Sequence, residues 1–145
     1  MSQNNAILVV EDNPADFFAT QRGLRKAGLA NKVVHCVTGE EALDFLLHRG
    51  RFAPVRPDKP GVILLDINLP GISGAEVLQT IRQEERTRSI PVIMLTTSND
   101  ERDIDVAYRN GANSYVQKPV DLDGFMQAVQ RLKDYWFELV ILPKA

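Results

Sequence analysis

The 145-residue sequence has a single cysteine, two histidines and no long apolar run. With only Cys36 present, a disulfide within the chain is excluded, and this is typical of proteins in a reducing compartment. No stretch approaches the roughly 18 apolar residues of a membrane-spanning helix. The first residues also lack the basic and apolar regions of a secretory signal. A formal net charge of −2 gives no electrostatic footprint for nucleic acid. These absences predict a cytoplasmic protein that binds neither a membrane nor nucleic acid.

What is present is an alternation of short β-branched runs with longer segments of helical periodicity, the pattern of βαβ units around a parallel sheet. We expect five strands, near 6–10, 32–37, 62–66, 91–96 and 114–117. We expect five helices, beginning near 14, 38, 75, 100 and 121, with the third ending near 86 and the last near 138. Asn13 and Pro14 have the pattern of a helix N-terminus, and Thr38 and Glu41 have the spacing of a capping box. The sequence therefore predicts a doubly wound α/β fold.

The segment 49–60 differs from the rest because it shows no periodicity. It contains three prolines, one glycine and four basic residues. We expect an exposed loop, longer than usual for this fold, and a candidate contact surface.

Polar side chains that can take part in chemistry follow the predicted strands. Apolar runs at 7–10, 62–65 and 92–95 and a shorter stretch at 114–117 lead, respectively, into Glu11 and Asp12, Asp66, Thr96, and Lys118. In a doubly wound fold, ligands bind beyond the carboxyl ends of the strands. We therefore expect these side chains to share one site.

Three carboxylates in one crevice cannot all stay ionised without raised pKa values or a bound cation. An oxygen-only donor set is typical of Mg²⁺, and no cysteine or histidine lies near enough in the predicted site to indicate zinc. Asp66 ends the most apolar strand, and a carboxylate can attack phosphorus to form an aspartyl-phosphate. Lys118 would then supply fixed positive charge and Thr96 a hydroxyl for the phosphoryl oxygens.

Four segments of the sequence resemble the receiver domain of two-component response regulators. They are VVEDNP at 9–14, LLDINLPGISG at 64–74, MLTTS at 94–98 and GANSYVQKP at 111–119. The resemblance spans nearly the whole chain and implies a flavodoxin-like fold with five parallel strands in the order 2-1-3-4-5. Within the family, the likeness is greatest to small regulators paired with cyanobacterial and bacterial phytochromes, based on EDNPAD at 11–16, the loop at 49–60 and the apolar tail.

The resemblance implies that a histidine kinase, for instance of the phytochrome type, transfers a phosphoryl group to Asp66. It further implies that Asp12 and Asp66 bind Mg²⁺ directly, together with the main-chain carbonyl of Asn68, and that Glu11 acts on the ion through water. Lys118 and Thr96 would assist phosphorylation, and Thr96 and Tyr115 would form a switch pair. The Lys118–Pro119 peptide bond would be cis. Such a protein would signal through protein contacts or phosphorelay. It would not be an enzyme acting on outside substrates, although it takes part in its own phosphorylation and dephosphorylation.

Several alternative interpretations stay open at this point. Asp66 and Lys118 could form a purely structural ion pair, and Tyr115 could be an ordinary aromatic of an edge strand. A phosphohydrolase of the haloacid-dehalogenase type also uses an aspartate nucleophile, but that family expects a second acid where Asn68 stands. A dinucleotide-binding module is disfavoured because the first βα turn lacks the glycine-rich pattern. For His35 and His48 we expect structural or surface roles.

We expect one receiver domain over residues 1–145, with a core at about 5–138 and no output domain. The apolar extension at 135–145 has more apolar surface than one side of a helix can bury. It predicts a symmetric homodimer through the last helix and tail, with folding of the tail onto its own domain as the alternative.

Overall fold

The computed structural model describes residues 6–26, 28–29, 31–54, 59–97, 101–118, 123–124 and 127. Its centre is a parallel sheet with strands in the order β2-β1-β3-β4-β5. The strands are β1 (Ile7–Val10), β2 (Val33–Cys36), β3 (Val62–Asp66), β4 (Val92–Thr96) and β5 (Ser114–Gln117). The predicted fold class and strand order are therefore confirmed, and each strand lies within about two residues of its expected position.

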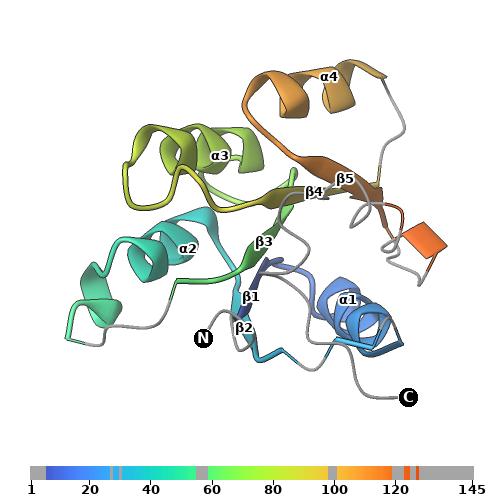
Figure 1. Ribbon diagram of the computed structural model, residues 1–145, viewed down its shortest axis with the longest axis horizontal. Helices are drawn as coiled ribbons and strands as arrows, with labels where there is room; N and C mark the ends of the chain where they lie inside the picture. Colours follow the sequence, from blue (N-terminus) through green and yellow to red (C-terminus); the bar gives the residue numbers. More distant parts are fainter. Residues whose placement is uncertain are drawn as a thin grey trace.

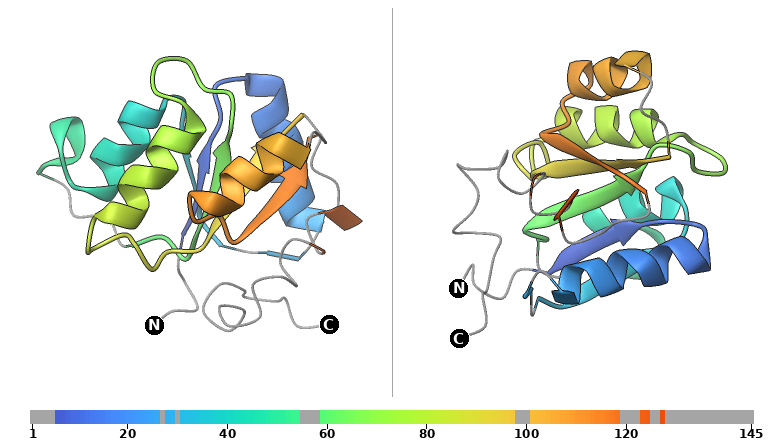
Figure 2. Two further views of the ribbon diagram at one scale, coloured as in Figure 1. Left: turned by 90° about the horizontal axis from the view of Figure 1, so that it is seen from above. Right: turned by 90° about the vertical axis from the view of Figure 1, so that its right-hand side faces the viewer.

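Both faces of the sheet are covered, which explains why the strands are continuous apolar runs rather than alternating ones. Leu8 and Val10 face a core cluster with side chains of α2 (Gly39–Leu46), α3 (Gly74–Gln83) and α4 (Glu101–Arg109). Ile7 and Val9 face the second cluster, which contains Leu24 of α1 (Pro14–Lys26). Figures 1 and 2 show α1 on one side of the strands and α2 and α3 on the other.

The ends of α1 follow the sequence signals. The Asn13 side chain accepts a hydrogen bond from the Asp16 N–H at 3.1 Å and caps the helix. At the other end, Gly28 has a φ of 85°, a left-handed conformation that glycine adopts without strain. The predicted box at Thr38 differs in one detail: Thr38 accepts from Glu41 N–H, but the Glu41 carboxylate accepts from Val37 N–H rather than from Thr38.

Helix α3 is shorter than predicted, ending at Gln83 rather than near 86. The Thr87 hydroxyl donates to the Ile81 carbonyl at 2.8 Å and so satisfies a group that another helical turn would have used. The chain turns away at Glu84, whose backbone is extended. At its start, Ser73 and Glu76 form a complete capping box that the sequence analysis did not identify.

The segment 49–60 is less irregular than predicted. It contains a short 3₁₀ helix, η2 (Gly50–Phe52), whose Phe52 ring packs edge-on against Phe45 at a centroid distance of 5.3 Å. Residues 55–58 lie outside the described residues, as do Pro119 and almost all of the predicted last helix and tail. Within the ranges given above, no helix has the length and apolar character needed to cross a bilayer.

Arg82 of α3 is a connection that the sequence analysis did not predict. Its guanidinium donates to the carbonyls of Gly111, Arg88 and Ile90 and to the Asn113 side chain, at 2.7 to 3.0 Å. The Asn113 side-chain oxygen also accepts from the Val92 N–H at 2.8 Å. One side chain therefore joins α3 to the segments that enter β4 and β5.

Candidate functional site

The residues at the carboxyl ends of β1, β3, β4 and β5 lie at one edge of the sheet. Glu11, Asp66 and Thr96 are 0%, 2% and 1% exposed, whereas Asp12 is exposed. The Lys118 side chain, which is 7% exposed, follows β5. The structure therefore brings the predicted acidic residues and the lysine together at the carboxyl ends of the strands, where a doubly wound fold binds its ligands.

Lys118 Nζ lies at the centre of three carboxylates. It is 2.9 Å from Glu11 Oε1, from Asp66 Oδ2 and from Asp16 Oδ2. Contact with all three satisfies the three N–H donors of the ammonium group. Asp16 is a site residue that the sequence analysis missed. Its position in the first turn of the helix that follows Glu11 and Asp12 was the signal in the sequence. Acidic residues are common in the first turn of any helix, because they interact favourably with the helix dipole, so this position did not indicate a site residue.

Glu11, Asp12 and Asp66 form a group suited to a metal ion. One carboxylate oxygen from each lies within 4.8 Å of the others. Hard divalent cations such as Mg²⁺ prefer oxygen ligands of this kind. The donor set therefore fits such a cation and offers no nitrogen or sulfur side-chain ligand.

Burial and the closeness of several charged groups shift the pKa values of two residues in the site. Burial, and next the neighbouring Asp66, raise the pKa of Glu11 to about 7, although hydrogen bonds from Lys118 and from Asn13 N–H oppose this. Burial lowers the pKa of Lys118, but hydrogen bonds to Asp16, Asp66 and Glu11 outweigh it, and the net shift is upward. The lysine is therefore held charged, while Glu11 is the acid that a further cation would help to ionise.

The raised pKa of Glu11 predicts a pH dependence of stability in the metal-free protein. The folded value near 7 exceeds the value of 4.5 expected without these neighbours, so the folded state binds more protons between them. The stabilisation from this group is full below the lower value and is lost as the pH rises through 7. We expect Glu11 to contribute at most ~3 kcal/mol of this change.

The test is to measure the free energy of unfolding in urea for metal-free wild type and for Glu11→Gln, at pH values between 4.5 and about 7. The wild type should lose stability relative to the variant as the pH rises. A constant difference between the two proteins across this range would contradict the assignment.

Hydrogen bonds and ring stacking hold the first acidic loop in place. The Glu11 carboxylate accepts from Asn13 N–H at 3.2 Å, and the Glu11 carbonyl accepts from His35 Nε2 at 2.7 Å. The His35 ring stacks on Phe17 of α1, with centroids 3.7 Å apart and planes 3° from parallel. His35 thus fixes the backbone beside the acidic group.

The turn after β3 places Asp66 through close backbone packing. Asn68 N–H donates to Asp66 Oδ1 at 3.0 Å, and Gly74 N–H donates to the Ile67 carbonyl at 3.0 Å. A Cβ atom at Gly74 would lie 2.3 Å from the Asp66 carbonyl oxygen, so no other residue fits without moving this loop. Gly74 is therefore required by the close packing of this turn against Asp66.

Thr96 and Tyr115 lie on the same face of the sheet. Tyr115 pairs with Met94, two residues before Thr96, so the two side chains are diagonal neighbours on adjacent strands. The half-buried Tyr115 ring meets Tyr108 of α4 edge-on, with centroids 6.1 Å apart. Tyr115 therefore contacts α4 from the sheet face on which Thr96 also lies.

Comparison with known proteins identifies one family. The model of the response regulator receiver domain matches residues 7–130. Response regulator Rcp1 of Synechocystis sp. is 36% identical over 139 residues, which cover 96% of this chain and 93% of that protein. The match gives no support to the haloacid-dehalogenase alternative.

Solved structures agree with the fold. The bacteriophytochrome response regulator RtBRR is 40% identical with a TM-score of 0.85, over 97% of this chain and 82% of that one. The Mn²⁺-bound form of Rcp1 is 35% identical with a TM-score of 0.74, and the phosphorylated cyanobacterial phytochrome response regulator RcpA is 35% identical with a TM-score of 0.76. In both cases the match covers 97% of this chain and 99% of the chain in the solved structure.

Proposed function

Because this chain belongs to the response regulator receiver family of two-component signalling, we propose that Asp66 is its phosphoacceptor and that a histidine kinase is the donor. The observation that carries the proposal is the position of Lys118 Nζ, 2.9 Å from Asp66 Oδ2 and beside the acidic group. A buried carboxylate with a charged lysine at this distance has both the nucleophile and the positive charge for phosphoryl transfer. The related RcpA, in a phosphorylated state, supports the same chemistry here.

The transfer is a displacement at phosphorus. An Asp66 oxygen forms the new O–P bond as the N–P bond to the donor histidine breaks, and the histidine nitrogen keeps that electron pair. Asn68 N–H and Lys118 orient the carboxylate before attack. During transfer, Lys118 neutralises charge on the phosphoryl oxygens, and the Thr96 hydroxyl donates a hydrogen bond to one of them.

Mg²⁺ is the cation we propose for the site, held by Asp12, Asp66 and the main-chain carbonyl of Asn68, with Glu11 acting through water. When bound, it would offset the charge of the acidic group and of the phosphoryl oxygens. The oxygen donor set supports a hard cation, and the Mn²⁺-bound form of the related Rcp1 supports a divalent one.

Asp12 offers a direct test of the metal site. It is exposed, so Asp12→Asn should leave the fold intact while removing one charged ligand. We expect Mg²⁺ affinity, measured by calorimetry, to fall about tenfold or more, since losing a ligand or its partner costs that much at metal sites. Asp105→Asn, an exposed aspartate of α4, is the matched control and should bind Mg²⁺ like wild type. Equal affinity in the Asp12 and Asp105 variants would exclude Asp12 as a ligand.

The output we propose is a change of surface that phosphorylation favours. Thr96 would move toward the phosphoryl group and Tyr115 would turn inward, altering its contact with Tyr108. Downstream, the protein would then contact another protein or pass the phosphoryl group onward.

The finer partner assignments are also proposals. The names of RtBRR and RcpA support a phytochrome-type kinase as donor. We place this exchange in the cytoplasm. The homodimer through the last helix and tail, like the cis Lys118–Pro119 bond, falls on residues outside the described ranges. Sedimentation at tens of micromolar, with and without a phosphoryl mimic, tests the dimer, and a monomer in both states would exclude it.

A further inference from the structure

A cavity of about 370 Å³ lies at the opposite end of the sheet from the acidic site. Its walls come from the carboxyl end of α2, the turn after α3 and the residues that enter β3 and β4. The apolar part of the lining is Phe45, Leu46, Pro60 and Ile90. This volume is within the range of about 300–1,000 Å³ typical of small-molecule sites.

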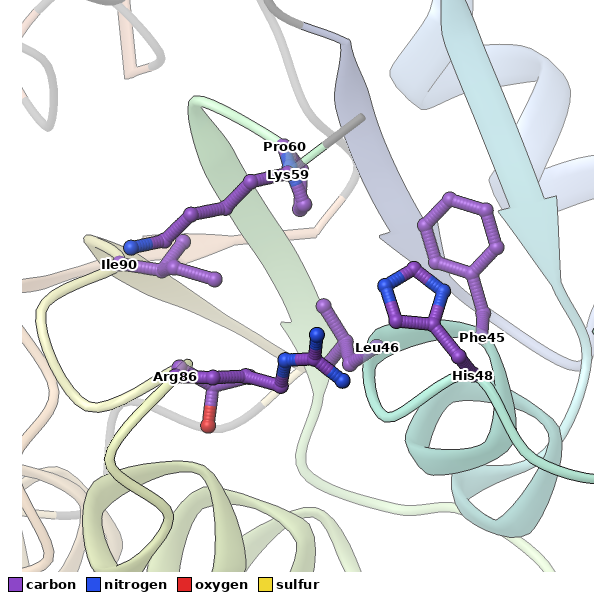
Figure 3. A pocket seen from close by; sticks show the side chains of 8 residues that line it. Phe45, Leu46, His48, Lys59, Pro60, Arg86 and Ile90 are labelled. Atoms are coloured by element: carbon purple, nitrogen blue, oxygen red, sulfur yellow. The ribbon is translucent and has the colours of Figure 1, made fainter. Parts of the chain in front are cut away.

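His48 lines this cavity and has two unusual features. Its Nδ1 is buried and has no hydrogen-bond partner, and its backbone has a φ of 55°. Left-handed backbone is uncommon for a residue with a side chain, and a buried polar atom without a partner is rare in folded proteins. His48 lines the cavity, and Figure 3 shows its second ring nitrogen, Nε2, on the side that faces Arg86, where it can donate a hydrogen bond to a ligand atom.

Arg86 faces His48 across the cavity. Figure 3 shows its guanidinium group pointing toward the imidazole ring from the opposite wall. Arg86 is exposed at the rim, and within the described ranges no carboxylate pairs with it. Lys59 adds a second positive charge nearby, its ammonium 3.3 Å from Ser89 Oγ. Among the residues that the structure describes, none of those that line the cavity is acidic.

The sign of the local charge favours an anion. The carboxyl ends of α2 and α3 face this end of the sheet, and each has a partial charge of about −0.5. The two full charges of Arg86 and Lys59 exceed these together, so the cavity has a net positive lining even with neutral His48.

From these features we propose that the cavity binds a small hydrophobic carboxylate, its carboxylate group between Arg86 and His48 and its apolar body against Phe45, Leu46 and Ile90. The planar guanidinium group suits bidentate bonding to a carboxylate. The apolar walls select against inorganic anions, which would leave them unfilled. The site is separate from the phosphoacceptor and does not depend on it.

Titration of the full chain with benzoate, followed by amide shifts in ¹H–¹⁵N spectra, tests the proposal. We expect saturable shifts centred on 45–48, 59–61 and 86–90, with a dissociation constant of about 1 mM or below. Benzamide, the neutral analogue, should bind at least about tenfold more weakly, because it lacks the charge that Arg86 recognises. Inorganic phosphate should not compete at equal concentration.

The decisive variant is Arg86→Gln, which should weaken benzoate binding by about tenfold or more. Arg88→Gln is the matched control. Arg88 lies two residues from Arg86 and carries the same charge, but its side chain does not line the cavity. This variant should bind benzoate within about twofold of wild type. His48→Asn, which tolerates the left-handed backbone, should also weaken binding. Absence of saturable shifts, equal binding of benzamide or phosphate, or unchanged affinity in Arg86→Gln would each overturn the proposal.

Discussion

Asp66→Asn is expected to abolish phosphorylation, both from a phosphorylated histidine kinase and from a small donor such as acetyl phosphate. The amide has nearly the same shape as the carboxylate but is a far weaker nucleophile, so no acyl phosphate forms. The mass of the intact protein, compared before and after incubation with donor and Mg²⁺, reports the result. Wild type should gain one phosphoryl group that hydroxylamine removes, and the variant should gain none.

Two further measurements make this result specific. Asp105→Asn changes an exposed aspartate of α4 in the same way and should be labelled like wild type. Thermal unfolding should show that the Asp66 variant remains folded, since removing one of several close carboxylates relieves repulsion. Full labelling of the Asp66 variant would refute the assignment of the phosphoacceptor.

Lys118→Met is expected to have the second-largest effect. The substitution removes the positive charge that contacts three carboxylates at 2.9 Å while keeping much of the side-chain volume. Loss of one positioned donor to a developing anion typically slows a reaction by about 10²–10³-fold. The initial rate of phosphorylation by acetyl phosphate at saturating Mg²⁺ should fall by about this factor.

The same substitution should also change stability in a metal-dependent way. Without Lys118, Glu11, Asp16 and Asp66 lose their common partner, and breaking a buried ion pair typically costs about 3–5 kcal/mol. The free energy of unfolding, measured in the presence of a chelator, should therefore be markedly lower for the variant than for wild type. Addition of Mg²⁺ should restore part of this loss. Lys26→Met, an exposed lysine of α1, is the control. A phosphorylation rate within twofold of wild type would remove Lys118 from the mechanism.

The sequence predicted the sheet and the position of the site well, because both depend on local patterns. Runs such as 62–65 are apolar on both faces, which only a covered parallel strand allows. The polar residue after such a run must then lie at the carboxyl edge of the sheet, and the structure places Glu11 and Asp66 there. The residue types at this edge were enough to predict a hard cation and a phosphoacceptor.

Features that depend on how separate segments meet could not be predicted in this way. Asp16, in the first turn of α1, reaches Lys118, which follows β5, although 102 positions separate them in the sequence. The early end of α3 depends on one hydroxyl, that of Thr87, reaching back to Ile81. The cavity at His48 and Arg86 is formed by the end of α2 and by the segments that enter β3 and β4, whose sequences show no shared pattern. Each is set by tertiary contacts rather than by periodicity.

Arg82 has a mechanical consequence for α4. By bonding to Gly111 and Asn113 it clamps the chain just beyond the carboxyl end of that helix. With its carboxyl end held in this way, α4 can tilt about that end more easily than it can shift along its axis. A rearrangement that starts at Thr96 would therefore tilt α4. The displacement would then be largest at the amino end of α4, the end that follows Thr96 in the chain.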